Sequence, residues 1–206
     1  MIKVERVETW GFEHAVRGMR NPMNSWDRSD SMFGKTYWCI GPDDLELMQK
    51  LYKAGTEHRK YLRQIFVSMD ITAPLYWWKE FDTYKVGTVA NSCSTMHKIH
   101  EKEFSLSDFS CEHCTMAIKE VIETLNAMRY CFLKTNSKVD WYAMIQLLPE
   151  SYNQKRTVTM TYENAVSIIH QRTGHKLDEW NEFCRILRKL PYIAEIEGSA
   201  TDGNNN

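Results

Sequence analysis

The sequence lacks an excess of positive charge and lacks long apolar runs, and each absence excludes a class of protein. Its 206 residues include 26 basic and 27 acidic side chains, for a net charge of −1. This balance gives no support for a polyanionic partner, so we expect neither nucleic acid nor a membrane surface to bind. The chain contains no run of about 18 apolar residues, so we expect no membrane span.

Cysteine is too sparse to build a disulfide framework. The chain has six cysteines in 206 residues, and its first nine residues are charged and lack the apolar core of a signal peptide. We therefore expect reduced thiols and a cytoplasmic protein. Aromatic residues make up 12% of the chain, so tryptophan and tyrosine are available both for a core and for the walls of a planar ligand.

The spacing of apolar residues predicts one α+β domain with a β-sheet, flanking helices and one long central helix. Alternating patterns predict strands over 2–7, 61–71 and 156–161. Helical patterns lie at 12–21, from 42 to a cap near 55, from 74 to about 83, and at 112–134, 140–148, 162–171 and 177–190. No repeat or shift in composition marks a linker. We therefore expect a single domain over 1–196 and a disordered tail over 197–206.

One stretch is too polar, and too particular in its order, for an ordinary core segment. It reads APLYWWKEFDTYKVGTVANSCSTMH over residues 73–97. Two tryptophans come first, then Thr83-Tyr84-Lys85, then Asn91-Ser92-Cys93-Ser94. We expect a helix up to about Thr83 and a polar loop after it. One tryptophan is expected in the core, and the other is available to stack on a ring or on another subunit.

Three segments in order resemble the flavin-dependent thymidylate synthases, the ThyX family, over about residues 43–188. The first, 54–74, looks like the family's helix end, strand and proline-led helix. The second segment follows the order of the family's signature, which is Arg-His-Arg, then Ser, then Asn-Glu and another Ser. The matching residues here are TYK at 83–85, Thr88, Asn91, Ser92 and Ser94. The third segment runs from LLPESY at 147–152 through RTGHKLDEWNEF at 172–183. It is similar to three features of the family: a Leu-Pro turn, a helix ending in Arg and a Gln-x-Glu-Ile-Arg segment.

The resemblance implies a ThyX-like fold, FAD as cofactor and methyl transfer to a pyrimidine nucleotide resembling dUMP. It also implies a homo-oligomer, a tetramer in the family, whose sites lie between subunits. It assigns no catalytic residue and no metal ligand. The ligand-binding residues that it implies are Glu80, Thr83, Tyr84, Lys85, Thr88, Asn91, Ser92, Ser94, Arg172, Glu179 and Asn181.

The matched positions lack most of the arginines with which the family binds phosphate. Thr83, Tyr84 and Lys85 replace Arg-His-Arg, and Asn181 replaces the arginine of Glu-Ile-Arg. Each charge-assisted hydrogen bond contributes roughly 1.5–3 kcal/mol, so losing several weakens phosphate binding by many powers of ten unless other groups replace them. Two interpretations therefore remain. One is a divergent flavin-dependent enzyme; the other is an inactive ThyX-like protein, for which a phage or prophage origin is plausible, that binds a nucleotide or a protein.

Two further patterns have competing interpretations. His97, His100, Cys111 and Cys114 have the pairwise spacing of zinc ligands, which suggests a small zinc-stabilised protein as a third hypothesis. The alternatives are a buried thiol with exposed histidines, which we favour, and a redox pair at a helix start.

The charged loop over 17–31 also has two interpretations. We favour a solvated loop with internal ion pairs. The alternative is that Arg17 and Arg20, on one helical face, supply cations to a ligand site.

Overall fold

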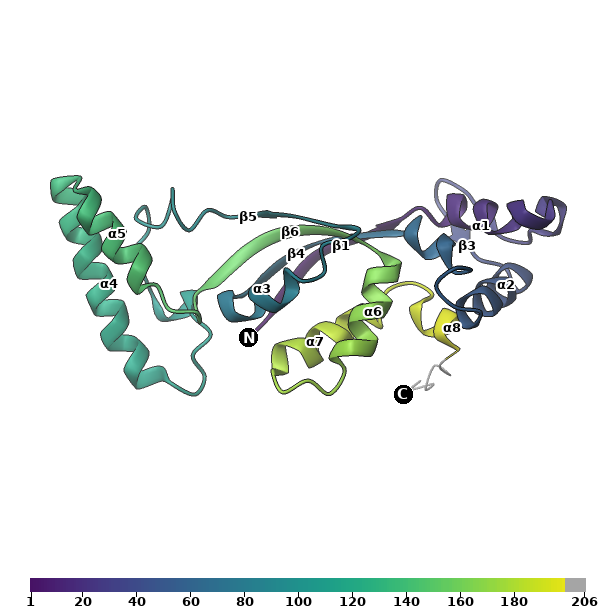
Figure 1. The fold of residues 1–206 in the computed structure, drawn as a ribbon. Helices are drawn as coiled ribbons and strands as arrows, with labels where there is room; N and C mark the ends of the chain where they lie inside the picture. The colour runs from purple at the N-terminus through teal and green to yellow at the C-terminus, as the bar shows by residue number, and fades with distance from the viewer. Residues whose placement is uncertain (199–206) are drawn as a thin grey trace. The chain divides into compact units, whose positions relative to one another are not determined.

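The main β-sheet has four strands in the spatial order β1-β4-β6-β5 (Figure 1). They are β1 (Lys3–Trp10), β4 (Phe66–Pro74), β5 (Thr88–Ser92) and β6 (Asn153–Thr161). The hydroxyl oxygens of Ser68 and Thr159 are 3.0 Å apart, and Thr157 donates a hydrogen bond to Asp70 over 2.7 Å. Residue numbers therefore rise along β4 as they fall along β6, so these two strands are antiparallel. A second sheet pairs β2 (Met32–Phe33) with β3 (Trp38–Cys39).

The computed structural model describes residues 1–198, and the chain forms two compact units. The first unit comprises residues 1–5, 70–83 and 90–158, and the second comprises 6–69, 84–89 and the chain from 159 onward. Of the tail that we expected over 197–206, residues 199–206 lie outside the described part. Glu197 is still helical, so helix continues one residue beyond the expected domain end.

The helices divide between the two units. The first unit contains α3 (Leu75–Phe81), the 3-10 turn η4 (Leu106–Asp108), α4 (Thr115–Thr135) and α5 (Lys138–Leu147). The helices of the second unit are α1 (Phe12–Arg20), α2 (Pro42–Lys53), α6 (Tyr162–Arg172), α7 (Asp178–Leu187) and α8 (Ile193–Glu197). Its 3-10 turns are η1 (Asn21–Met23), η2 (Trp26–Arg28) and η3 (Lys60–Arg63). The expected α+β class is confirmed.

Local sequence explains where α2 begins and ends, as predicted. Pro42 occupies the first turn, and the carboxylate of Asp30 accepts hydrogen bonds from the backbone N–H groups of Asp43 (2.9 Å) and Asp44 (3.1 Å). These contacts satisfy donors that have no partner inside the helix. Gly55 follows the helix with φ +102°, a conformation that favours glycine.

One predicted strand and one predicted loop were wrong in part. The strand expected over 61–71 begins only at Phe66, because Tyr61 and Leu62 are consecutive buried residues in η3. Burial on both sides of the chain breaks the alternation that a half-buried strand requires. The loop expected after Thr83 contains β5, a short edge strand whose residues are mostly exposed. Its two apolar residues, Val89 and Ala90, are adjacent, so the sequence carries no apolar alternation from which a strand could be predicted.

The expectations for α3 and α4 also need correction. Trp77 and Trp78 are both buried, with 0% and 1% of their surface exposed, so neither is available to stack on a ligand or a subunit. The indole of Trp78 donates to the carbonyl of Gln154, and this bond accommodates its polar atom inside the core. The helix expected over 112–134 begins only at Thr115, and Met116 in its first turn is 77% exposed.

The first unit has its own hydrophobic cluster, and one of the paired cysteines and one of the paired histidines contact it. Cys111 packs in this cluster, and the ring of His100 lies 4.9 Å from that of Phe132. Within residues 1–198, no three His, Cys, Asp or Glu side chains meet as a metal site would require. All six cysteines are free thiols. None of the described helices is both long and apolar enough to cross a membrane.

Candidate ligand-binding site

The residues implied as ligand contacts divide between the two units, and each group is described within its own unit. The second unit holds Tyr84, Lys85, Thr88, Arg172, Glu179 and Asn181. The first unit holds Glu80, Thr83, Asn91, Ser92 and Ser94. The second unit's group contains the most elaborate set of polar contacts, and it is organised around one guanidinium group.

Arg172, the last residue of α6, is held between two aromatic rings. Its guanidinium carbon lies 4.5 Å from the centre of the Trp180 ring and 5.7 Å from that of Tyr84. Its Nε donates to the hydroxyl of Tyr84 over 2.9 Å, and its Nη1 lies 3.2 Å from Nε2 of His175. Ring faces attract the cation, and the hydrogen bonds fix its orientation. The fold therefore holds a preoriented positive charge here.

Tyr84 connects this guanidinium to the rest of α6. Its hydroxyl accepts from Arg172 and donates to Oε1 of Gln171 over 3.0 Å. The phenol therefore uses both its donor and its acceptor capacity. Its ring meets Trp180 edge to face, with centroids 6.1 Å apart. The sequence implied a role for both Tyr84 and Arg172, but not that they touch.

Asn181 and Glu179 come from α7 and lie beside the turn that follows α6. Oδ1 of Asn181 accepts from the backbone N–H of Gly174 over 2.9 Å, and its Nδ2 donates to the carbonyl of His175 over 2.8 Å. Gly174 has φ +75°, so the turn requires a residue that tolerates this conformation. Glu179 is only 8% exposed. The side-chain amide of Asn181 thus fixes the turn that carries His175 to Arg172.

Thr88 and Lys85 belong to a tight turn that packs on the start of α6. The amide nitrogen of Asn164 donates to Oγ1 of Thr88 over 2.7 Å and to the carbonyl of Val86 over 2.6 Å. Gly87 has φ +72°, and a Cβ there would lie 3.2 Å from the side chain of Thr161. Lys85 is exposed. Sequence reasoning missed Asn164 and Gly87, although a glycine four residues after Thr83 was a turn signal.

The first unit's predicted residues have local backbone contacts or are exposed. Thr83 donates through Oγ1 to the carbonyl of Glu80 over 2.7 Å, just after α3. Oγ of Ser94 accepts from the backbone of His97 over 2.9 Å, which forms a turn after β5. Asn91 and Ser92 are exposed on β5. The contacts of Thr83 and Ser94 therefore order the backbone just after α3 and just after β5.

The hypothesis that Arg20 supplies a ligand-binding cation was wrong. Arg20 is 4% exposed, and its Nε donates to Asp44, which is fully buried, over 2.6 Å. Its charge is thus used inside the second unit. Arg17 is exposed and lies 3.1 Å from Nδ1 of His14. The favoured interpretation of internal ion pairing holds for Arg20.

Comparison with known proteins bears on the fold. No family model matches the sequence, and no curated protein matches it. A crystal structure of the flavin-dependent thymidylate synthase ThyX from Helicobacter pylori, complexed with FAD and dUMP, superposes with a TM-score of 0.74 at 15% identity, covering 95% of this chain and 97% of that one. A second structure of Helicobacter pylori ThyX with FAD and dUMP has a TM-score of 0.74 at 15% identity, and the match covers 98% of each chain. The UMP/dUMP methylase PolB from Streptomyces cacaoi, bound with 5-Br dUMP, superposes with a TM-score of 0.71 at 12% identity. The match covers 97% of this chain and 94% of that one. The chain therefore has the ThyX fold.

Proposed function

We propose that this chain, which has the fold of the ThyX flavin-dependent thymidylate synthases, is a flavin-dependent enzyme that transfers a methyl group to a pyrimidine nucleotide resembling dUMP. The fold is shared over nearly the whole chain with proteins complexed with FAD and dUMP or bound with 5-Br dUMP, which supports the proposal. The observation that carries it is the guanidinium of Arg172, oriented by Tyr84, His175 and Trp180. It is the kind of group that recognises a phosphate.

The donor set of the second unit fits an anionic, partly aromatic molecule. Arg172 offers a planar cation, and Lys85 offers a second positive charge on an exposed turn. The ring of Tyr84, which is partly exposed, provides apolar surface beside the guanidinium, and the buried ring of Trp180 supports the guanidinium from within the unit. These residues would hold the phosphate groups of FAD or of the nucleotide. When bound, the flavin would supply hydride transfer, whereas the residues of the chain bind, orient and exclude water.

Spectroscopy of the purified protein tests this function directly. We expect the absorbance spectrum of a flavin, FAD released on denaturation and identified by mass spectrometry, and a change in the flavin spectrum when dUMP is added. Once the flavin has been reduced with dithionite, an isotope-labelled methylene donor should give labelled thymidylate, with the two electrons supplied by the reduced flavin. A colourless protein that also fails to bind added FAD would refute the catalytic proposal, because no other group in the chain supplies hydride.

A second candidate is a ThyX-fold protein that binds a nucleotide without catalysis. It is favoured by the residues at the signature, where Thr83-Tyr84-Lys85 provides one cation, and by the contacts that Arg172 already makes within the chain. Under this function the protein binds dUMP in the absence of flavin, and added FAD changes neither the affinity nor the spectrum. Titration of dUMP with and without FAD therefore separates the two candidates.

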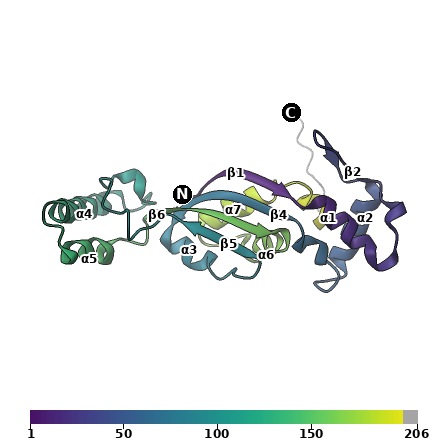
Figure 2. The same cartoon turned by 90° about the horizontal axis from the view of Figure 1, so that it is seen from above.

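We further propose that the chain self-associates through α4 and α5, which lie side by side (Figures 1 and 2). Several large apolar side chains on this pair are exposed, and an exposed apolar group of this kind often marks a protein interface. They are Met116, Tyr130, Leu133, Val139, Tyr142 and Leu147.

Light scattering coupled to gel filtration should therefore give a mass that is a multiple of the 24.3 kDa chain. We expect Leu133→Glu with Val139→Glu to lower that mass, because both side chains are more than half exposed and would bury charge in the interface. Asn136→Asp, between the two helices, with Gln146→Glu on α5 adds the same charge and should leave the mass unchanged. A wild-type mass equal to one chain would contradict self-association.

A further inference from the structure

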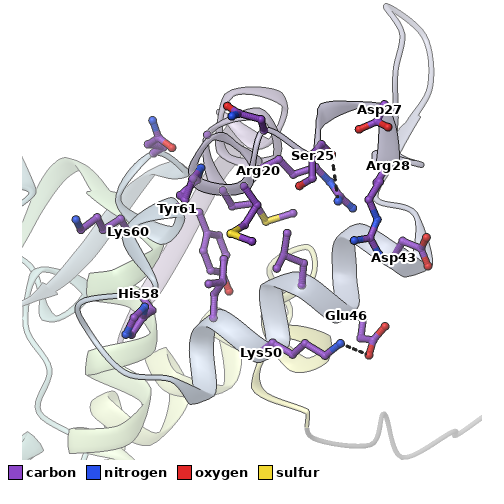
Figure 3. A pocket seen from close by; sticks show the side chains of 18 of the residues that line it. Arg20, Ser25, Asp27, Arg28, Asp43, Glu46, Lys50, His58, Lys60 and Tyr61 are labelled. Atoms are coloured by element: carbon purple, nitrogen blue, oxygen red, sulfur yellow. Dashed lines mark hydrogen bonds and ion pairs between the residues drawn. The ribbon is translucent and has the colours of Figure 1, made fainter.

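A pocket of about 970 Å³ lies within the second unit, between α1, α2 and η3 (Figure 3). Four lysine or arginine side chains and four aspartate or glutamate side chains line it, together with His58. This balance of charge favours neither an anionic nor a cationic ligand. The more specific chemistry that the proposed function does not use lies in the first unit, in a pair of cysteines.

These two cysteines, Cys111 and Cys114, belong to one tight turn just before α4. The backbone N–H of Cys114 donates to the carbonyl of Cys111 over 3.1 Å. A turn closed by such a bond brings its first and last Cα atoms within about 7 Å of each other. Most disulfides join Cα atoms that are about 4.4–6.8 Å apart. The turn therefore brings the two cysteines to a separation that a disulfide can bridge.

Contacts on both sides fix this turn. Oγ1 of Thr115 donates to the carbonyl of Cys111 over 3.1 Å, and the backbone N–H of Ile118 donates to the carbonyl of Cys114 over 3.0 Å. Ile118 and Cys111 both belong to the hydrophobic cluster of the first unit. The start of α4 and the cluster thus hold the two cysteines near each other, so a disulfide between them requires no large movement of the backbone.

The two thiols differ in their exposure and therefore in their reactivity. Cys111 is only 8% exposed, whereas Cys114 is exposed. Burial raises the pKa of the Cys111 thiol, and the neighbouring Cys114 and Glu112 raise it further. Because the thiolate is the nucleophile, Cys111 is slow to react with a reagent in solution. Cys114 is therefore the thiol that such a reagent meets first.

We propose that Cys111 and Cys114 form a redox-active dithiol that small-molecule disulfides oxidise reversibly. The thiolate of Cys114 attacks one sulfur of the reagent, forms a mixed disulfide and releases one half of the reagent, which takes up the proton that Cys114 lost. Cys111 then attacks the sulfur of Cys114, and its proton goes to the second half of the reagent as that half leaves. The protein loses two electrons and two protons, and the reagent gains them as two thiols. The proposal uses no residue assigned to the flavin function.

Oxidised glutathione added to the full chain tests the proposal, with the masses of tryptic peptides as the readout. The peptide over 103–119 contains Cys111 and Cys114 and no other cysteine. We expect this peptide to lose the mass of two hydrogen atoms, and dithiothreitol to restore it. Cys111→Ser should instead retain glutathione on Cys114, at a level about tenfold above that of the wild type, because no neighbouring thiol displaces it.

Cys93 provides the matched control, because it is exposed and has no second cysteine within four residues along the chain. Oxidised glutathione is raised until Cys93 carries a mixed disulfide, which should persist in the wild type and in Cys111→Ser alike. Cys114→Ser should leave the buried Cys111 unmodified. Circular dichroism checks that each variant is folded, and the mass of the wild-type peptide depends on no variant. A wild-type peptide that keeps both thiols, or that retains glutathione on Cys114 as Cys111→Ser does, would overturn the proposal.

Discussion

Replacement of Asp44 by alanine is expected to lower the free energy of unfolding by about 3–5 kcal/mol, the usual cost of removing one partner from a buried ion pair. Asp44 is 0% exposed and Arg20 is 4% exposed, so the change leaves a guanidinium without its counter-ion inside the second unit. It also removes the acceptor for Ser29 and Ser31. Chemical denaturation monitored by tryptophan fluorescence measures the loss.

The same carboxylate makes stability depend on pH. Burial by itself raises the pKa of Asp44, but hydrogen bonds from Ser31, Ser29 and Arg20 together outweigh it and hold the pKa below its ordinary value of 3.8. The unfolded chain therefore binds a proton before the folded one does as the pH falls. The contribution of Asp44 is complete above pH 3.8 and is lost as the pH falls through the folded pKa. Wild type and Asp44→Ala should therefore converge in stability in acid.

Two further variants separate charge from packing at this position. Asp44→Asn keeps the shape but loses the charge, and we expect it to destabilise the protein almost as much, since Arg20 remains buried and unpaired. The double change Arg20→Met with Asp44→Leu removes both charges and should cost clearly less than either single change. If the double variant were as unstable as Asp44→Ala, the lost hydrogen bonds of Ser29 and Ser31, and not the unpaired guanidinium, would account for most of the destabilisation.

Local signals in the sequence were sufficient for most helices but not for contacts between distant segments. Pro42 with two acidic residues marked the start of α2 correctly. In contrast, nothing in the sequence around Arg20 shows that its partner is Asp44, 24 residues later. The edge strand β5 was missed because most of its side chains, including the apolar Val89, are exposed to solvent. A pattern of burial predicts an element only where one of its faces is buried.

In the candidate site too, the sequence did not predict contacts between distant segments. Tyr84 and Arg172 are 88 residues apart, and resemblance to a family implied each of them singly. Their hydrogen bond depends on the turn at Gly87 and on Asn164, neither of which carries a charge that would single it out. The pocket beside α2 was not predicted at all, because its lining alternates apolar and charged residues along a helix, a pattern typical of any solvated helix face.

Replacement of Arg172 by glutamine is expected to weaken binding of dUMP, and of FAD where it binds, by about 10- to 150-fold, since a hydrogen bond to a charged group contributes roughly 1.5–3 kcal/mol. Tyr84→Phe keeps the ring but removes the acceptor for Arg172, and we expect a smaller loss of about 2- to 13-fold, which corresponds to one ordinary hydrogen bond of roughly 0.5–1.5 kcal/mol. Titrations followed by calorimetry or flavin absorbance measure both effects.

Arg188→Gln provides the matched control for Arg172, because Arg188 also donates to the turn after α6, through Thr173 over 2.7 Å, but is exposed. It should leave the affinity for dUMP unchanged.

Thermal unfolding of each variant separates a loss of binding from a loss of fold, since Arg172 lies against the buried Trp180. If Arg172→Gln unfolded at a lower temperature yet bound dUMP as the wild type does, the guanidinium would serve the packing of α6 on α7, and the phosphate would have to be bound elsewhere. If affinity fell while the unfolding temperature stayed within the range of the Arg188 variant, the loss would lie in binding and not in the fold, as expected of a cation that binds the phosphate.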